Sequence, residues 1–300
     1  MKLETIPARA KIIQRANAAV RLGLAWAALG TTVAALTGCA SPGPGTGTGP
    51  STGSVAAAAP KVDAAVRQAL APTGTLRVGV YAGSPTSLVK AADGRPAGVA
   101  HDLGQALARD LGVLVQVVEF ARLAQVLEAL KAGQVDFTFT NATEARAKEM
   151  DFTSPLVRLE LGYLVPAGSR LLRIDEVDRP GVRVGVAQGS TSQTVLGARL
   201  QQASVVATPS LDAARAMLAD GRLDTFATNK GILNELSDTL AGSRILDGRW
   251  GLETMAIAIP QGRAAARPWL QGWAHSITQD GRLRAVVQRS GLRGLASDRD

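Results

Sequence analysis

The stretch GQVDFTFTN at residues 133–141 decides the fold, because it returns in loosened form as GRLDTFATN at residues 221–229. A second phrase recurs in the same order: RVGVYAGS at residues 77–84 returns as RVGVAQGS at residues 183–190. Two phrases that keep one order, with spacers of different length, indicate a diverged duplication rather than a short tandem array. We therefore predict two related structural units.

Each copy alternates strand-like and helix-like patterns. In the first, helical periodicity at residues 101–112, with Asp102 as a candidate N-cap, and at residues 122–133 separates three apolar strand-like runs. The second copy keeps this order, with a strand-like run at residues 182–188 and a helical one at residues 210–221. This alternation is typical of an α/β protein in which helices flank a mainly parallel sheet.

Two further strand-like segments, at residues 156–166 and 252–260, belong to neither copy and are natural crossing points between two lobes. Ligands of open parallel sheets bind beyond the carboxyl ends of the strands, where both repeated phrases end. We expect one cleft between the lobes. Its candidate lining residues are Ser84, Asn141, Gly189, Ser190 and Asn229, with Tyr81 and Phe120 as aromatic neighbours that could equally belong to the core.

Arg146 is the sharpest candidate for binding. It follows Thr143 and Glu144 at the front of a predicted helix, where a forked guanidinium would add to free N–H groups that favour an anion. The alternative is that Arg146 pairs with Glu149 or Asp151 on its own surface.

The N-terminus has the layout of a secretory signal. Basic residues precede an uncharged run at residues 22–38, and the sequence LTGC at residues 36–39 resembles a bacterial lipobox. We predict a lipoprotein signal peptide at residues 1–38 and lipidation of Cys39. A retained membrane helix is the alternative, although the run is short for spanning a bilayer. Cys39 is the only cysteine, so an intrachain disulfide is excluded.

A Pro, Gly, Ser and Thr-rich segment follows, and we interpret residues 39–72 as a flexible tether, with a short helix within residues 60–72. Removal of residues 1–38 takes away five basic residues and Glu4, which lowers the formal charge from +8 to +4. With aromatic residues at 4%, nucleic-acid binding has little support.

The sequence offers few residues for a catalytic or metal-binding motif. The two histidines, His101 and His275, lie far apart in the sequence, and neither a Gly-x-Ser-x-Gly elbow nor paired cysteines occur. We expect no catalytic residue, no metal and no cofactor.

The folded part resembles the bacterial extracellular solute-binding proteins of family 3, the polar amino-acid binding components of ABC importers. The resemblance rests on TLRVGV at residues 75–80, GVAHDLGQALARDLG at residues 98–112 and TEARAKEMDFTSP at residues 143–155. In the last stretch Arg146 stands five residues before Asp151, as in the family pattern.

The resemblance implies the two-lobed periplasmic-binding-protein type II fold, with two crossing strands as a hinge. Residues 73–157 and 258–300 would form the first lobe, and residues 158–257 the second, including the hinge strands. The family arginine binds the carboxylate of the solute as a bidentate pair. The ligand-binding residues implied on this basis are Arg146, Asn141, Thr140, Thr143, Tyr81, Ser84, Phe120, Gly189, Ser190, Thr191 and Asn229.

Three departures from the family pattern concern the ligand. Asn229 stands where the family has an aspartate for the ligand's ammonium group, the strand that leads to Arg146 lacks a glycine whose carbonyl would accept from that group, and Pro85-Thr86 replaces an aromatic wall. A carboxylate without an ammonium group, or an amine bound by Glu160 or Glu253, would fit as well as an ordinary amino acid.

We therefore predict a monomeric, lipid-anchored solute-binding protein on the periplasmic side of the cell envelope, which delivers a small carboxylate-containing solute to an ABC permease of the inner membrane. We expect it not to be an enzyme. The alternatives are a periplasmic enzyme of the cyclohexadienyl-dehydratase type on the same scaffold, and a ligand sensor.

Overall fold

The computed structural model describes residues 62–297. The predicted signal peptide, the lipidation site Cys39 and most of the predicted tether lie outside these residues. The short helix expected within residues 60–72 is α1 (Ala64–Leu70). Its Val66 and Leu70 are buried in the largest core cluster, so this end of the predicted tether is packed onto the folded body.

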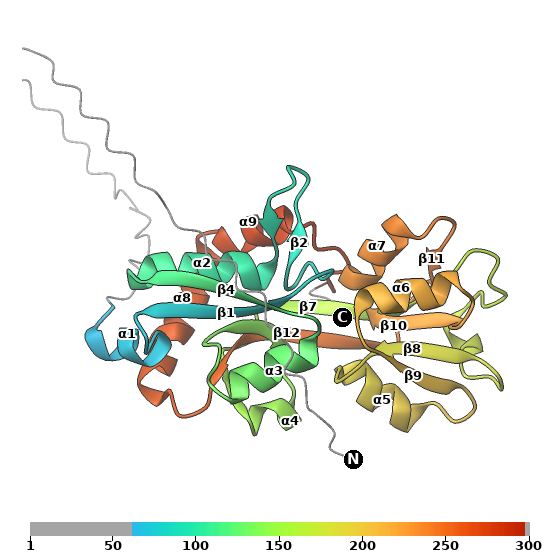
Figure 1. The fold of residues 1–300 in the computed structure, drawn as a ribbon, viewed down its shortest axis with the longest axis horizontal. Helices are drawn as coiled ribbons and strands as arrows, with labels where there is room; N and C mark the ends of the chain where they lie inside the picture. Colours follow the sequence, from blue (N-terminus) through green and yellow to red (C-terminus); the bar gives the residue numbers. More distant parts are fainter. Residues whose placement is uncertain (1–61, 298–300) are drawn as a thin grey trace, which may run out of the picture. The chain divides into compact units, whose positions relative to one another are not determined.

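The first lobe combines the first repeat copy with the C-terminal helices. It contains α1, β1 (Thr75–Tyr81), β2 (Val89–Lys90), β3 (Pro96–Ala97), α2 (Val99–Leu111), β4 (Leu114–Phe120), α3 (Leu123–Lys131), β5 (Thr138–Asn141), α4 (Glu144–Ala147), β6 (Met150–Phe152), the 3₁₀ turn η2 (Ala264–Ala266), α8 (Arg267–Gln279) and α9 (Arg282–Arg289). Figure 1 shows α2 and α3 on opposite sides of β1, as expected when helices flank a sheet.

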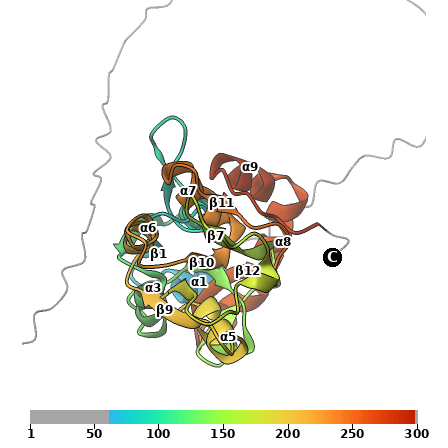
Figure 2. The same cartoon turned by 90° about the vertical axis from the view of Figure 1, so that its right-hand side faces the viewer.

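The second lobe contains the second copy. Its elements are η1 (Ile174–Glu176), β8 (Arg183–Ala187), α5 (Thr191–Arg199), β9 (Ser204–Thr208), α6 (Leu211–Ala219), β10 (Thr225–Asn229), α7 (Lys230–Thr239) and β11 (Arg244–Ile245). Figure 2 shows α5, α6 and α7 arranged around the strands of this lobe.

Two long strands, β7 (Val157–Val165) and β12 (Gly251–Pro260), cross between the lobes (Figure 1). They are antiparallel to each other, and β12 also pairs with β5 and β6 while β7 pairs with β10 and β11. Within each copy the pairs are parallel: β1 with β4, and β8 with β9 and β10. The expected α/β fold with two crossing strands is therefore confirmed, with mixed pairing where the crossing strands join the sheet.

The repeated phrases place the same ion pair in each lobe. The Arg77 guanidinium donates from Nε and Nη2 to the two carboxylate oxygens of Asp136, at 2.7 and 2.8 Å, and the backbone N–H of Arg77 donates to the same group. Arg183 and Asp224 repeat all three contacts at 2.8–2.9 Å. Each pair joins the start of the RVGV strand to the turn before the returning strand.

The glycine of each RVGV phrase has a matching role in packing. A Cβ atom on Gly79 would lie 3.0 Å from side-chain atoms of Val126 and Val135, and one on Gly185 would lie 2.4 Å from Leu223. Val135 and Leu223 occupy the same place in the two copies, directly before the paired aspartates. The repeated phrases in the sequence thus form the same arrangement in both lobes: an arginine–aspartate ion pair beside a closely packed glycine.

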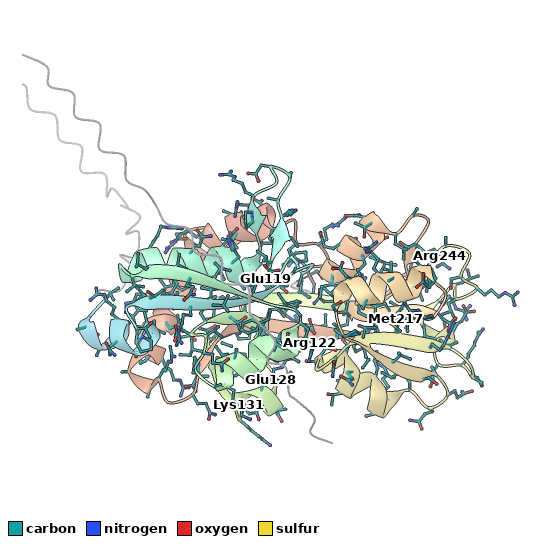
Figure 3. The ribbon with its side chains drawn as sticks, viewed as in Figure 1. Glu119, Arg122, Glu128, Lys131, Met217 and Arg244 are labelled. Carbon is teal, nitrogen blue, oxygen red and sulfur yellow. The ribbon has the colours of Figure 1, made fainter. Side chains whose placement is uncertain are left out.

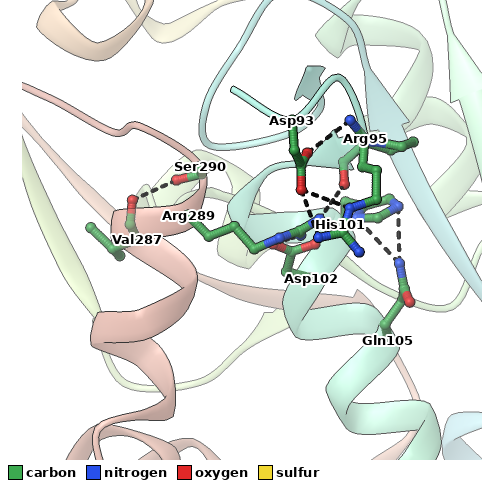
Figure 4. A network of polar contacts seen from close by, with 9 residues as sticks. Asp93, Arg95, His101, Asp102, Gln105, Val287, Arg289 and Ser290 are labelled. Atoms are coloured by element: carbon green, nitrogen blue, oxygen red, sulfur yellow. Dashed lines mark hydrogen bonds and ion pairs between the residues drawn. The ribbon is translucent and has the colours of Figure 1, made fainter. Parts of the chain in front are cut away.

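Asp102 does not cap α2, contrary to the sequence-based expectation. The helix begins at Val99, and Gly98 is its N-cap. Glycine is required at this position, because a Cβ atom would lie 2.2 Å from the Ser87 carbonyl oxygen. Asp102 instead contacts His101 and accepts from Arg289 of α9 (Figure 4). Burial opposes its ionisation, but these two partners outweigh burial and lower the pKa of Asp102.

No helix within residues 62–297 has the length and apolar character needed to cross a bilayer.

The two repeated ion pairs predict unequal losses of stability. Asp136 is fully buried and also accepts from Arg263, whereas Asp224 is 35% exposed with Arg183 as its cationic partner. Asp136→Ala should lower the free energy of unfolding by about 3–5 kcal/mol, since it removes the one buried carboxylate shared by two partly buried guanidinium groups. Asp224→Ala should cost about 1 kcal/mol or less. Urea unfolding followed by circular dichroism measures both, and equal losses would contradict the assignment.

Candidate functional site

A small cavity lies where the strand ends of both lobes meet. Residues from β1, β5, β10 and β12 line it, together with the loop before α3 and the turn before α5. The space available to the centre of a water molecule is ≈ 40 Å³. Since one water needs about 10–15 Å³ of such space, the cavity suits a small solute.

Six of the eleven residues expected to bind the ligand line this cavity: Tyr81, Thr140, Asn141, Arg146, Ser190 and Asn229. They come from both lobes and from strands far apart in the sequence. Their roles as ligand contacts stay predictions, but the structure brings them together.

The other five do not line the cavity. Thr143 caps α4 by accepting from the backbone N–H of Arg146, and Ser84 shares a hydrogen bond with Thr86, which does line the cavity. Phe120 packs against the core. Gly189 donates its N–H to Gln193, and Thr191 accepts from Asn141 across the lobes. Four of these five thus support neighbouring residues, and Phe120 belongs to the core.

The guanidinium of Arg146 is held from one side. Its Nη1 donates to the Thr140 hydroxyl at 2.9 Å and to the Asn141 carbonyl at 3.1 Å. No carboxylate of the described residues forms an ion pair with it. Burial lowers the pKa of Arg146, and the nearby Glu253 and Tyr81 only partly offset this effect. A partly buried cation without a paired anion is costly, so the site favours an incoming anion.

The alternative surface role of Arg146 is not realised. Glu149 forms its ion pair with Lys131, and Asp151 lies 3.7 Å from Arg267. The two carboxylates that stood nearest in the sequence therefore have other partners.

Asn229 contacts an acidic residue of the cavity, Glu253. Asn229 accepts from the backbone N–H of Ile232 at the start of α7, and its Nδ2 donates to Oε2 of Glu253 at 3.0 Å. Glu253 is 8% exposed, lies on β12 and lines the cavity. Burial raises its pKa, although Asn229 and Arg146 act in the opposite direction. The carboxyl group at the cavity therefore lies on β12, which is separated from β10 by the other crossing strand, β7.

Glu160, the other candidate for an amine, lies elsewhere. It forms ion pairs with Lys230 and Arg249 and does not line the cavity. The expectation that Glu160 could bind a ligand amine is therefore not supported by its position.

Sequence reasoning missed Arg122. It directly precedes α3, lines the cavity, and its Nε is buried without a hydrogen-bond partner. Its sequence context, the front of a predicted helix after a strand, is the same signal that singled out Arg146. The apolar residues Phe139, Leu211, Ile232 and Met255 of the wall give no such signal, because their patterns also fit the core.

No cluster of three or more potential metal ligands occurs within residues 62–297.

Residues 76–291 match the bacterial extracellular solute-binding proteins, family 3, and the chain belongs to this family. It is 27% identical to the L-arginine-binding protein of Pseudomonas aeruginosa, over 62% of this chain and 76% of that protein. It is 29% identical to the virulence sensor protein BvgS of Bordetella bronchiseptica, over 50% of this chain but 12% of the sensor. The chain thus spans a small part of the sensor's length.

Among solved structures, the fold matches AncCDT-1, an ancestral amino acid-binding protein and a precursor of cyclohexadienyl dehydratase. The TM-score is 0.65 at 24% sequence identity, with 74% of this chain and 97% of that chain covered. This likeness concerns the fold alone. The resemblance and the fold class expected from the sequence are both confirmed.

Close approach of the two lobes at Gly189 can be tested by adding a methyl group there. This residue has φ +75°, and a Cβ atom on it would lie 2.7 Å from the Cβ of Ala124 in the other lobe. Gly189→Ala should weaken solute binding by about tenfold or more, since overpacking of this size costs roughly 1–3 kcal/mol. Calorimetric titration with the solute measures the change.

Gly181→Ala is the matched control, because Gly181 has φ +82° and a Cβ atom there would have no neighbour within 4 Å. It should carry the same backbone strain and leave the affinity unchanged. Equal affinities for the two variants would argue against close approach of the lobes at Gly189.

Proposed function

We propose that the protein is the solute-binding component of an ABC importer and captures a small carboxylate-containing solute, an amino acid or a related compound. The observation that carries this proposal is the Arg146 guanidinium, which lines the cavity with two neutral oxygen acceptors and no paired carboxylate. A carboxylate from the solute would complete its coordination with charge-assisted hydrogen bonds. Membership of the solute-binding family supports the same reading.

The remaining members of the site fit this role. Asn141 donates to Thr191 across the lobes and accepts from the backbone of Thr254, so one side chain connects both lobes with a crossing strand. Tyr81, Leu211 and Phe120 share one apolar cluster that contains residues of both lobes. Capture by closure of two lobes over the solute would use these contacts.

An enzyme on this scaffold is the second candidate. Glu253 is a buried carboxyl group in the cavity whose pKa is raised by burial, which is the environment of many general acids. The ancestral neighbour that precedes a dehydratase makes this alternative concrete. Against it, no second acid or base lines the cavity among residues 62–297 apart from Tyr81 and the arginines. We therefore favour binding without turnover.

We also propose where the protein acts in the cell envelope. The lipobox-like LTGC at residues 36–39 and the polar segment after it support a periplasmic protein held at the membrane by a lipid on Cys39. The permease would be the partner, and the protein would act as a monomer. A ligand-binding module of a sensor is the alternative suggested by the match to BvgS.

Arg146→Ala should lower the affinity for the solute by about 100-fold or more, because a buried charge partner is lost. The melting temperature of the free protein should stay the same or rise, since the variant no longer holds a partly buried cation without a paired anion. A thermal-shift screen of amino acids, amines and organic acids identifies the solute, and calorimetry then compares the variants.

The control is Arg109→Ala, which removes an exposed arginine of α2 that lies outside the cavity. Unchanged solute affinity in Arg146→Ala would refute the central role of Arg146. Conversion of the solute by the wild-type protein would favour the enzyme.

Cys39→Ser should release the protein from the membrane fraction, because the serine cannot carry the lipid. Fractionation of cells that express each form, followed by immunoblotting, measures the distribution. Persistence of the variant in membranes would favour a retained helix over residues 22–38.

A further inference from the structure

We propose that the solute is an acidic α-amino acid, with its α-carboxylate on Arg146, its side-chain carboxylate on Arg122 and its ammonium group on Glu253. This inference rests on the proposed binding function and narrows the class of solute.

Arg122 is the first reason. Its side chain lines the cavity and forms no ion pair with any described residue, and its buried Nε lacks a hydrogen-bond partner. Figure 3 shows Arg122 at the start of α3, facing the second lobe. Buried donors in native proteins are nearly always paired, because an unpaired one has lost its hydrogen bonds to water without gaining a partner. A second anionic group of the solute would satisfy it.

The charges of the cavity are the second reason. Two arginines, Arg122 and Arg146, line it, and Glu253 is the one carboxylate among its described lining residues. Two cations and one anion complement a solute with two carboxylates and one ammonium group. A basic amino acid would add a second cation without a second carboxylate to receive it. A neutral amide would leave the charge of Arg122 unpaired.

The geometry of Glu253 is the third reason. Asn229 donates to its Oε2 and leaves Oε1 without a partner among the described residues. An ammonium group at Oε1 would stabilise the ionised carboxylate, which burial alone disfavours. Asn229 thus positions Glu253, and the chain can bind an ammonium group although the aspartate of the family pattern is absent.

Calorimetric titration of the purified protein with L-aspartate, L-glutamate, L-asparagine, L-glutamine, L-arginine and succinate tests the proposal. At least one acidic amino acid should bind about tenfold or more tightly than its own amide, since a hydrogen bond to a charged group contributes about 1.5–3 kcal/mol. Succinate, which has no ammonium group, should bind more weakly than the acidic amino acids.

Two variants assign the groups. Arg122→Gln should abolish the preference for the acid over the amide, whereas Arg109→Gln, at an exposed arginine of the same lobe, should keep it. Glu253→Gln should weaken binding of the acidic amino acid by about tenfold or more and should affect succinate less.

Tighter binding of L-arginine or L-glutamine by the wild-type protein, or an unchanged preference in Arg122→Gln, would overturn the proposal. The dependence of binding on Arg146 would survive either result, so the proposed function would stand. Failure of every amino acid and organic acid to bind would remove both.

Discussion

The bidentate arginine–aspartate pair is the constraint on which both lobes depend. Arg77 with Asp136, and Arg183 with Asp224, fix the start of one strand against the turn that leads into its partner. Because the beginnings of the strands are held in register, their carboxyl ends lie close together. Tyr81, Asn141 and Asn229 stand at these carboxyl ends and line the cavity. Close packing at Gly79 and Gly185 fixes the same joint from the side. A cavity between the lobes follows from building this joint twice and joining the copies through β7 and β12.

The cavity concentrates charge that the protein itself does not neutralise. Arg146 is held by two neutral oxygen atoms, Arg122 has a buried donor without a partner, and Glu253 receives one amide hydrogen bond. Such an arrangement destabilises the free protein slightly and rewards a solute of complementary charge. The carboxyl group that lines the cavity comes from Glu253 of β12, which accepts a hydrogen bond from Asn229 of β10.

Much of this architecture could be predicted from the sequence. The duplication and the crossing strands follow from the repeats and the strand-like patterns, and the place of Arg146 follows from the motif that it shares with the family. The ion pairs between Arg77 and Asp136 and between Arg183 and Asp224 lie inside the repeated phrases, yet their partners are distant in sequence, so pattern alone could not pair them. Glu253 is a candidate from the sequence for contact with an amine, but its burial near the start of β12 and its contact with Asn229 depend on the fold. The local pattern wrongly predicts Asp102 as a helix cap, because its actual partner, Arg289, comes from the last helix and is distant in the sequence.

The guanidinium of Arg146 is the group to which we expect the carboxylate of the solute to bind. A crystal structure of the protein with its bound solute tests this most directly. We expect a solute carboxylate in the cavity with its oxygens about 2.7–2.9 Å from the guanidinium nitrogens of Arg146, the distance of charge-assisted hydrogen bonds. A solute bound in the cavity with no anionic group at Arg146 would show that Arg146 does not bind the carboxylate.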